Sequence, residues 1–446
     1  MIVPRTKELA IKNGCKAVPD DLKVGRWPII EKEDILAVMK VLERGEFMEN
    51  VYDSEDVPSL EREYAEYVGV KHCVATNSGT SSLHMAVAAC GIGPGDEVIV
   101  TAFSFVASGV SILHNQAIPV FVDIDPKTYN IDPKKIEEKI SERTKAIMAV
   151  DFQGLPADMD EIKAVAKKFN LVVIEDGSQA EGATYKGRKT GSLGDICGAS
   201  IVACKPLASG GEGGLLTTDN DEYYEKAERM KTFGEIIPPD GKQLLNYNAL
   251  ALGYNYKMVP FCAAMARTQL RRLDEYNKLR QDAAEYLSKE LDSLPGLQSP
   301  IVPSDRTHTY YAYRFRVNAE EAGLDLDNGR FRQALQDILV AEGVPVGAYQ
   351  IRPIPGQTIF QEKKGYGKGC PWTCPHARKV EYDMQDYPET LRTIEETLRF
   401  PPQHYPPLSR KILDVYLGAF KKVFDQLGEV EDYAKRLDYR PPWEVV

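Results

Sequence analysis

The sequence predicts an α/β fold, with a mostly parallel sheet in a large domain and a smaller α+β domain after it. Between Cys73 and Thr218, short apolar runs alternate with segments of helical periodicity. This alternation is typical of βαβ units, whose strands pair in parallel. Two strand candidates in succession, 198–203 and 214–218, are joined only by a short glycine-rich loop. They predict one antiparallel pairing within the sheet.

The expected elements follow the chain in order. Apolar residues at helical spacing predict helices at 33–43 and 59–67. The strands are expected at 72–75, 97–101, 118–123, 146–150, 171–175, 198–203 and 214–218, and the helices between them at 80–90, 105–114, 133–140 and 158–169. A long helix, 261–291, then leads to a strand at 311–317 and helices at 330–342 and 409–427. We therefore divide the chain into an N-terminal arm, 1–30, a large domain, 31–294, and a small domain, 295–446.

Composition excludes several classes of function. The net charge of −11 disfavours a general nucleic-acid or anionic-membrane surface. No apolar run approaches the roughly 20 residues that span a bilayer, and the N-terminus lacks the apolar core of a secretory signal. The eight cysteines are scattered, and most have apolar or small neighbours. We expect reduced thiols and a cytoplasmic enzyme.

Two residues in the 172–214 stretch carry the clearest chemistry. Asp176 follows an apolar strand candidate, the position at which open α/β sheets bind ligands. Lys205 follows the next apolar run and lies among small residues. A lysine amine attacks carbonyl groups once its surroundings lower its pKa. Together, a lysine and an acid suit pyridoxal 5'-phosphate, which needs an amine for its aldehyde and an acid for its ring nitrogen.

These residues belong to a series of motifs in a fixed order. The motifs are Asn77-Ser-Gly-Thr-Ser-Ser-Leu83, Thr101-Ala-Phe-Ser-Phe-Val-Ala-Ser108, Glu175-Asp-Gly-Ser-Gln-Ala180, Ser200 five residues before Lys205 with Gly211-Glu-Gly-Gly214, and Gly253-Tyr-Asn-Tyr-Lys-Met258. The series resembles the DegT/DnrJ/EryC1/StrS family of sugar and cyclitol aminotransferases. The resemblance covers roughly residues 25–435 and implies the type I pyridoxal-phosphate transferase fold, which is like that of aspartate aminotransferase.

The resemblance assigns catalytic roles to Lys205 and Asp176. Lys205 would form an aldimine with the cofactor and later carry a proton between the substrate and cofactor carbons. Asp176 would keep the pyridine nitrogen protonated, although an acid at a strand end can also cap a helix. Gln179 would hydrogen-bond the phenolic oxygen of the cofactor.

Other residues would hold the cofactor from its remaining sides. Gly79 and Thr80 open a helix and, with the Ser200 hydroxyl, would bind the phosphate. Phe105 would stack on the cofactor ring, and Phe103 is the alternative for that role. Asn255 would reach the phosphate from the neighbouring subunit, which implies a homodimer with shared active sites.

The sequence predicts no metal site. Cys370, Cys374 and His376 are poorly spaced for zinc, and no second ligand cluster accompanies them. The glycine- and proline-rich stretch 365–376 is therefore expected to be an ordered loop. With Trp27-Pro28, this insertion resembles the branch of the family that acts on inososes.

We therefore expect amino transfer from glutamine or glutamate to a keto-cyclitol or keto-sugar. Family members often carry a substrate-contacting histidine where this chain reads Arg352-Pro-Ile-Pro-Gly-Gln357, so the motifs leave the substrate open. Three alternatives remain: an aminotransferase for a nucleotide-linked ketosugar, a lyase or dehydratase with the same cofactor, and a regulator that senses pyridoxal phosphate. Formation of a keto acid from glutamine or glutamate would identify an aminotransferase.

Overall fold

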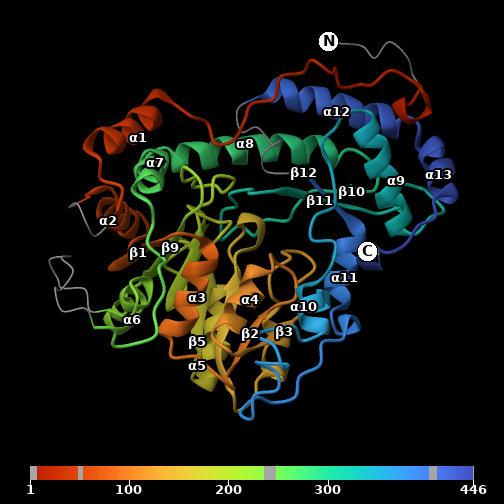
Figure 1. Cartoon of the computed structure of the whole chain (residues 1–446). Helices are drawn as coiled ribbons and strands as arrows, with labels where there is room; N and C mark the ends of the chain where they lie inside the picture. Colours follow the sequence, from red (N-terminus) through yellow and green to blue (C-terminus); the bar gives the residue numbers. More distant parts are fainter. Residues whose placement is uncertain (1–7, 49–53, 236–247, 401–408, 445–446) are drawn as a thin grey trace.

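The structure is a computed structural model that describes residues 8–48, 54–235, 248–400 and 409–444. Its centre is a seven-stranded sheet flanked by helices, and α8 (Leu273–Leu291) leads from this part to a second, smaller sheet with its own helices (Figure 1). The expected α/β fold, with a mostly parallel sheet, is confirmed.

The large sheet has the strand order β1-β9-β8-β5-β4-β2-β3. Its members in sequence order are β1 (His72–Thr76), β2 (Glu97–Thr101), β3 (Ile118–Val122), β4 (Thr144–Val150), β5 (Val172–Asp176), β8 (Ile196–Ser200) and β9 (Gly214–Thr218). The antiparallel pairing of β8 and β9 was predicted. In addition, β9 lies between β8 and β1 and is antiparallel to both. The remaining pairings are parallel, so the C-terminal ends of β2, β3, β4, β5 and β8 lie at one edge.

Helices cover the sheet largely where the sequence predicts them. These are α3 (Gly79–Ala89), α4 (Ala107–His114) and α5 (Met159–Phe169). A further helix, α6 (Asp221–Lys231), was not predicted. The helix expected at 133–140 is wrong: this stretch forms two 3-10 turns, Pro133–Lys135 and Glu137–Lys139. Its amides, such as those of Lys139 and Ile140, bond to the third residue back, which is the 3-10 pattern rather than the α-helical one. A two-stranded hairpin, β6 (Thr184–Tyr185) and β7 (Arg188–Lys189), was also not predicted.

The long helix expected at 261–291 is two helices. α7 (Pro260–Leu270) ends at Arg271, and α8 begins after Arg272, whose backbone leaves the helical region (φ −108°, ψ 1°). α1 (Lys32–Arg44) and α2 (Asp56–Val68) pack against α7. The break turns the Arg272 side chain toward α1.

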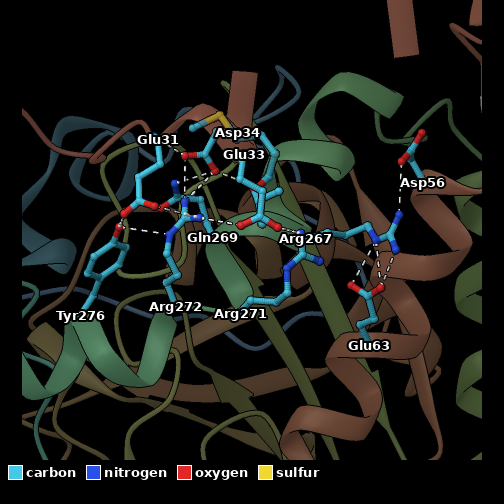
Figure 2. A network of polar contacts seen from close by, with 12 residues as sticks. Glu31, Glu33, Asp34, Asp56, Glu63, Arg267, Gln269, Arg271, Arg272 and Tyr276 are labelled. Atoms are coloured by element: carbon cyan, nitrogen blue, oxygen red, sulfur yellow. Dashed lines mark hydrogen bonds and ion pairs between the residues drawn. The ribbon is translucent and has the colours of Figure 1, made fainter. Parts of the chain in front are cut away.

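Figure 2 shows the polar network that joins α1 to this break. Asp34, only 1% exposed, accepts two hydrogen bonds from the Arg272 guanidinium, at 2.7 and 2.8 Å, and others from Gln269 and Thr268. Burial alone would raise the pKa of Asp34, but these bonds and one from the Glu31 amide outweigh it and hold the pKa below its ordinary value. The charged carboxylate therefore stabilises the helix break.

The C-terminal part is built on a three-stranded antiparallel sheet. It contains β10 (Leu297–Gln298), β11 (Tyr313–Val317) and β12 (Thr397–Phe400), with α9 (Asn328–Ala341), α12 (Arg410–Phe424) and α13 (Leu427–Arg436). The helix expected at 409–427 is α12, whereas α13, which follows it, was not predicted. One hydrophobic cluster combines these elements with α8 and with Leu9 and Val18 of the N-terminal arm. The division at residues 30 and 294 stays a prediction.

Residues from 354 to 396 pack back onto the large sheet. They include α10 (Thr358–Gln361) and α11 (Pro388–Glu396), which lie beside β2 and β3 in Figure 1. In the inserted loop, the buried Trp372 indole donates to the Tyr382 hydroxyl, which donates to the Pro119 carbonyl of β3, both at 3.0 Å. The insertion thus covers the β3 edge of the sheet.

The ranges that the structure describes hold no cluster of three or more side chains that could bind a metal, and Cys370 and Cys374 are free thiols. Nor does any helix within these ranges combine the length and the apolar character that a bilayer crossing requires.

Candidate active site

A cavity of about 370 Å³ opens at the C-terminal edge of the parallel strands. Seven of the eight predicted site residues line it: Gly79, Thr80, Phe105, Asp176, Gln179, Ser200 and Lys205. Open α/β sheets bind their ligands at this edge. The fold thus brings together motifs that lie up to 126 residues apart in the sequence (205 − 79).

The first turn of α3 forms one end of the cavity. Ser78 caps the helix, because its hydroxyl oxygen accepts a hydrogen bond from the Ser81 amide. The amides of Gly79 and Thr80 precede the first intrahelical bond and have no acceptor within the helix. A Cβ on Gly79 would lie 2.3 Å from the Cβ of Ser200, so only glycine lets the turn approach the end of β8. The turn and the Ser200 hydroxyl form a cradle for an anion.

Asp176 ends β5 and is 4% exposed. Its carboxylate accepts hydrogen bonds from the Ser108 hydroxyl at 2.7 Å and the Ser178 amide at 3.2 Å. The Gln179 side-chain oxygen accepts from the Gln153 amide at 2.8 Å, which orients its amide nitrogen. An acid and an amide donor are therefore held side by side.

Both the backbone amide and the backbone carbonyl of Lys205 form hydrogen bonds. Its amide donates to the Val202 carbonyl, and its carbonyl accepts from the Trp27 indole at 2.9 Å. The side-chain nitrogen lies 4.2 Å from the centre of the Tyr311 ring. Desolvation lowers the pKa of Lys205 below its ordinary value, although the nearby Glu181 carboxylate opposes the shift. A lowered pKa leaves more of the amine unprotonated and nucleophilic.

The structure distinguishes Phe105 from Phe103. Phe103 is fully buried and packs against Phe152, with the ring centres 4.8 Å apart. Phe105 is 50% exposed and lines the cavity. Phe105 is therefore the aromatic ring that is free to cover a bound molecule.

Asn255 is the predicted site residue that this chain does not bring into its own cavity. Its side chain is exposed, and its carbonyl accepts a hydrogen bond from the Asn77 side chain at 3.3 Å. The Tyr256 carbonyl accepts from the Asn77 amide at 2.8 Å. Asn255 thus lies beside the turn that begins α3 without lining the space above it.

Several lining residues were not predicted from the sequence. They are Ser108, Gln153, Tyr311, Tyr349, Gln350 and Arg399. Ser108 ends one of the recognised motifs and could have been found there, whereas the last four belong to the second half of the chain, where no motif points to them. Glu181 was also missed: it is 1% exposed, and burial raises its pKa to about 8.

The residues fit pyridoxal phosphate. The Gly79–Thr80 turn suits its phosphate, Asp176 its ring nitrogen and Lys205 its aldehyde, while Phe105 offers a ring to cover one face. The tight contact between Gly79 and Ser200 is needed for this arrangement, because a side chain at Gly79 would fill the cradle.

Known proteins of similar sequence and structure agree with this interpretation. The DegT/DnrJ/EryC1/StrS aminotransferase family matches residues 28–396. The chain is 34% identical to the spore coat polysaccharide biosynthesis protein SpsC of Bacillus subtilis, over 89% of this chain and 95% of that protein. It is 38% identical to the L-glutamine:2-deoxy-scyllo-inosose aminotransferase of Streptoalloteichus tenebrarius, over 68% and 73% of the two chains.

Among solved structures, the aminotransferase from Psychrobacter cryohalolentis superposes with a TM-score of 0.77, at 30% identity, over 91% of this chain and all of that one. The family match spans most of the chain and includes the lysine and the aspartate of the cavity. The chain therefore belongs to the DegT/DnrJ/EryC1/StrS family of pyridoxal-phosphate-dependent aminotransferases.

Proposed function

We propose that this aminotransferase moves an amino group from glutamine or glutamate to a keto-cyclitol of the inosose type. Amino transfer is supported above all by one observation: Lys205 and Asp176 line the same cavity. The preference for a cyclitol is supported by the inserted loop and by the similarity to an enzyme whose name specifies glutamine and an inosose.

A second cavity of about 440 Å³ supports a polyhydroxylated substrate. It shares Phe105, Tyr349 and Gln350 with the first cavity, and the other side chains that line it are neutral polar or apolar, apart from one arginine. Its one arginine, Arg352, already donates to the Trp443 carbonyl at 2.7 Å. Hydroxyl and amide groups around an uncharged ring suit this lining.

The chain's own residues define the chemistry. Bound pyridoxal phosphate supplies an aldehyde and an electron-accepting ring. Asp176 keeps the ring nitrogen protonated, and the turn at Gly79 fixes the phosphate. The Lys205 amine removes the proton from the donor carbon that bears nitrogen, and it later returns a proton to the former ketone carbon. Phe105 excludes water from one side of the site.

Two alternatives to this proposal, a different ketone substrate and a different type of reaction, are distinguishable by experiment. The similarity to a dTDP-3-amino-3,6-dideoxy-alpha-D-galactopyranose transaminase of Aneurinibacillus thermoaerophilus, 38% identical over 66% of this chain and 77% of that protein, favours a nucleotide-linked ketosugar. A lyase or dehydratase, by contrast, would release no keto acid from the donor. Purified enzyme should be incubated with glutamine or glutamate and a panel of inososes and nucleotide-linked ketosugars, with mass spectrometry of the products. We expect an aminocyclitol together with the keto acid. Amination of the nucleotide-linked sugars alone would contradict the cyclitol proposal.

We also propose that the active unit is a homodimer. The exposed side of α1 carries Ile35, Leu36, Met39 and Leu42, each 44–55% exposed, and such a contiguous apolar stripe is typical of an interaction surface. Leu252 and Val259, on either side of Asn255, are 81% and 47% exposed. Burying this segment against a second copy would carry Asn255 toward the partner's phosphate turn.

Mixing two inactive variants tests the shared site. Lys205→Ala and Asn255→Ala each remove a different part of it. If Asn255 acts across the interface, a mixed dimer contains one site with both defects and one with neither. Mixing and subunit exchange should then restore up to about half of the activity per mixed dimer, by counting sites at a two-fold interface. The measurement is specific activity against mixing ratio.

Two controls complete the mixing experiment. Each variant alone must be strongly impaired, and exchange must be shown with differently tagged subunits. With both conditions met, an absence of rescue would refute the shared site and leave the role of Lys205 intact.

A further inference from the structure

Two glutamine side chains that line the cavity depend on one buried arginine. Gln153 follows β4, and Gln350 lies in the segment between α9 and α10, where it lines both cavities. Both residues have a left-handed backbone, with φ angles of 55° and 59°. Such conformations are uncommon for residues other than glycine and occur often at binding sites. The chemistry described above uses neither side chain.

Arg314 of β11 holds both side chains. It is 2% exposed, and its guanidinium donates to the side-chain oxygens of Gln153 at 3.2 Å and Gln350 at 3.3 Å. Its third acceptor is the Thr397 hydroxyl at 2.6 Å, which donates in turn to the Thr393 carbonyl at 2.6 Å. Because this hydroxyl is itself held in place, the guanidinium is fixed against β12.

The chemistry of arginine decides which way the two amides point. A guanidinium has five N–H donors and no acceptor, so only the oxygen of each amide can face Arg314. The nitrogen of each amide is directed away from the arginine, and none of the described residues accepts a hydrogen bond from it. Since both side chains line the cavity, these N–H groups are available to a bound molecule. The two donors lie next to each other, because both oxygens contact one guanidinium.

We propose that Arg314 positions Gln153 and Gln350 as a pair of N–H donors that bind neighbouring oxygens of the ketone substrate. This inference rests on the proposed polyhydroxylated ketone and identifies side chains that bind its oxygens. Arg314 is a positioning residue, since it acts through the two amides. Within the described ranges it forms no ion pair with a carboxylate. Its positive charge therefore polarises the amides and strengthens their N–H groups as donors.

A pair of neutral donors selects for oxygen atoms at defined positions of the ring. An analogue without the hydroxyl beside the ketone would leave an N–H group unpaired in the cavity, and sites of this kind reject such analogues. The ratio of kcat/KM for the hydroxylated ketone to kcat/KM for its deoxygenated analogue therefore measures the contribution of the amides. We expect a ratio of at least about tenfold in the wild-type enzyme.

The test replaces Gln350 in two ways and follows the ketone half-reaction of the holoenzyme by stopped-flow spectroscopy. Gln350→Met removes the donor and should lower the ratio below about threefold. Gln350→Glu keeps an oxygen for Arg314 but presents a second oxygen to the cavity in place of the N–H group, so it should lower the ratio as well.

Thermal unfolding of Gln350→Glu distinguishes recognition from a structural role. Burial lowers the pKa of Arg314, so its charge is costly there, and a new carboxylate beside it offsets that cost. The melting temperature should therefore equal or exceed that of the wild type while the ratio falls. A wild-type ratio in this variant would show that Gln350 only supports Arg314.

Arg314 is tested through the same ratio. Arg314→Met should lower it as Gln350→Met does, and Arg314→Lys, which retains the charge, should restore part of it. Gln333→Met is the matched control, because the Gln333 side chain also accepts from a buried arginine, Arg332, at 3.1 Å but lies outside the cavity lining. It should leave the ratio unchanged.

The design separates this inference from the proposed function. The ratio is measured with whichever ketone the enzyme aminates, an inosose or a nucleotide-linked ketosugar, so a wrong choice between them leaves the inference intact. Calorimetry with the corresponding alcohol, an inositol or a nucleotide-linked hexose, does not depend on amino transfer, and Gln350→Met should raise its Kd at least about fivefold. Wild-type ratios in both Gln350 variants with unchanged binding of the alcohol would overturn the inference.

Discussion

Replacing Lys205 with alanine is expected to abolish transamination. The side chain is the only amine that lines the described cavity, and it serves both to hold the cofactor and to move the proton. Removing a positioned general base alone costs about 10²–10⁴-fold in rate, and the loss of the covalent link adds to it. We expect both half-reactions of Lys205→Ala to fall by at least about 10⁴-fold.

Chemical labelling checks the same residue independently of rate. Borohydride reduction of the wild-type holoenzyme, followed by peptide mapping, should place the cofactor label on Lys205. Lys278→Ala, which removes an exposed lysine that pairs with Asp282 at 2.6 Å, should retain both the activity and the label on Lys205. A label on another lysine of the wild-type enzyme would show the assignment to be wrong.

The second large effect is expected for Asp176→Asn. The amide is nearly isosteric and its oxygen still accepts the Ser108 hydrogen bond, so the fold and the phosphate cradle should persist. Without a negative charge, the ring nitrogen loses its proton and the ring accepts electrons poorly. We expect cofactor binding to remain measurable, while the donor half-reaction slows by about 10²–10⁴-fold.

The matched control for Asp176→Asn is Asp123→Asn. Asp123 also follows a parallel strand, β3, but it accepts from the Thr390 amide and hydroxyl and lies outside the cavity lining. Its loss should lower thermal stability and leave the half-reaction per folded enzyme unchanged. Turnover of Asp176→Asn at the level of this control would refute the proposed role of Asp176.

The sequence predicted those parts of the fold that depend on local patterns. All seven strands of the large sheet were expected, because each is a short apolar run between turns. The insertion of β9 between β1 and β8 was not expected, since strand order depends on long-range pairing. The break between α7 and α8 was missed for a related reason: Arg271 and Arg272 are good helix formers, and only the contact of Arg272 with Asp34, 238 residues away, explains it.

In the candidate site, too, local sequence patterns predicted some residues, whereas others depend on contacts between distant parts of the chain. Residues in contiguous motifs, such as Asp176, Ser200 and Lys205, were predicted because their neighbours in sequence are also their neighbours in space. Tyr349 and Arg399 come from segments without a motif, and they reach the cavity only because the small sheet packs beside the large one. The choice between Phe103 and Phe105 as the ring that covers the cofactor depends on how deeply each side chain is buried. The sequence of so short a segment does not show which of the two is exposed.

The attachment of the N-terminal arm bears on how this protein is made. The Ala10 amide bonds to Glu342, 332 residues later, Lys12 pairs with Glu429, and the Trp27 indole caps the carbonyl of Lys205, 178 residues later. The arm is synthesised before all three partners, and two of them, Glu342 and Glu429, lie more than 300 residues further along the chain. At about 5–20 residues per second, the 332 residues that separate Ala10 from Glu342 take roughly 17–66 s to synthesise. During that time the Trp27 end of the arm gains its partner at Lys205, whereas the Ala10 end still lacks Glu342. The two ends of the arm therefore dock at different stages of folding, the Trp27 end first.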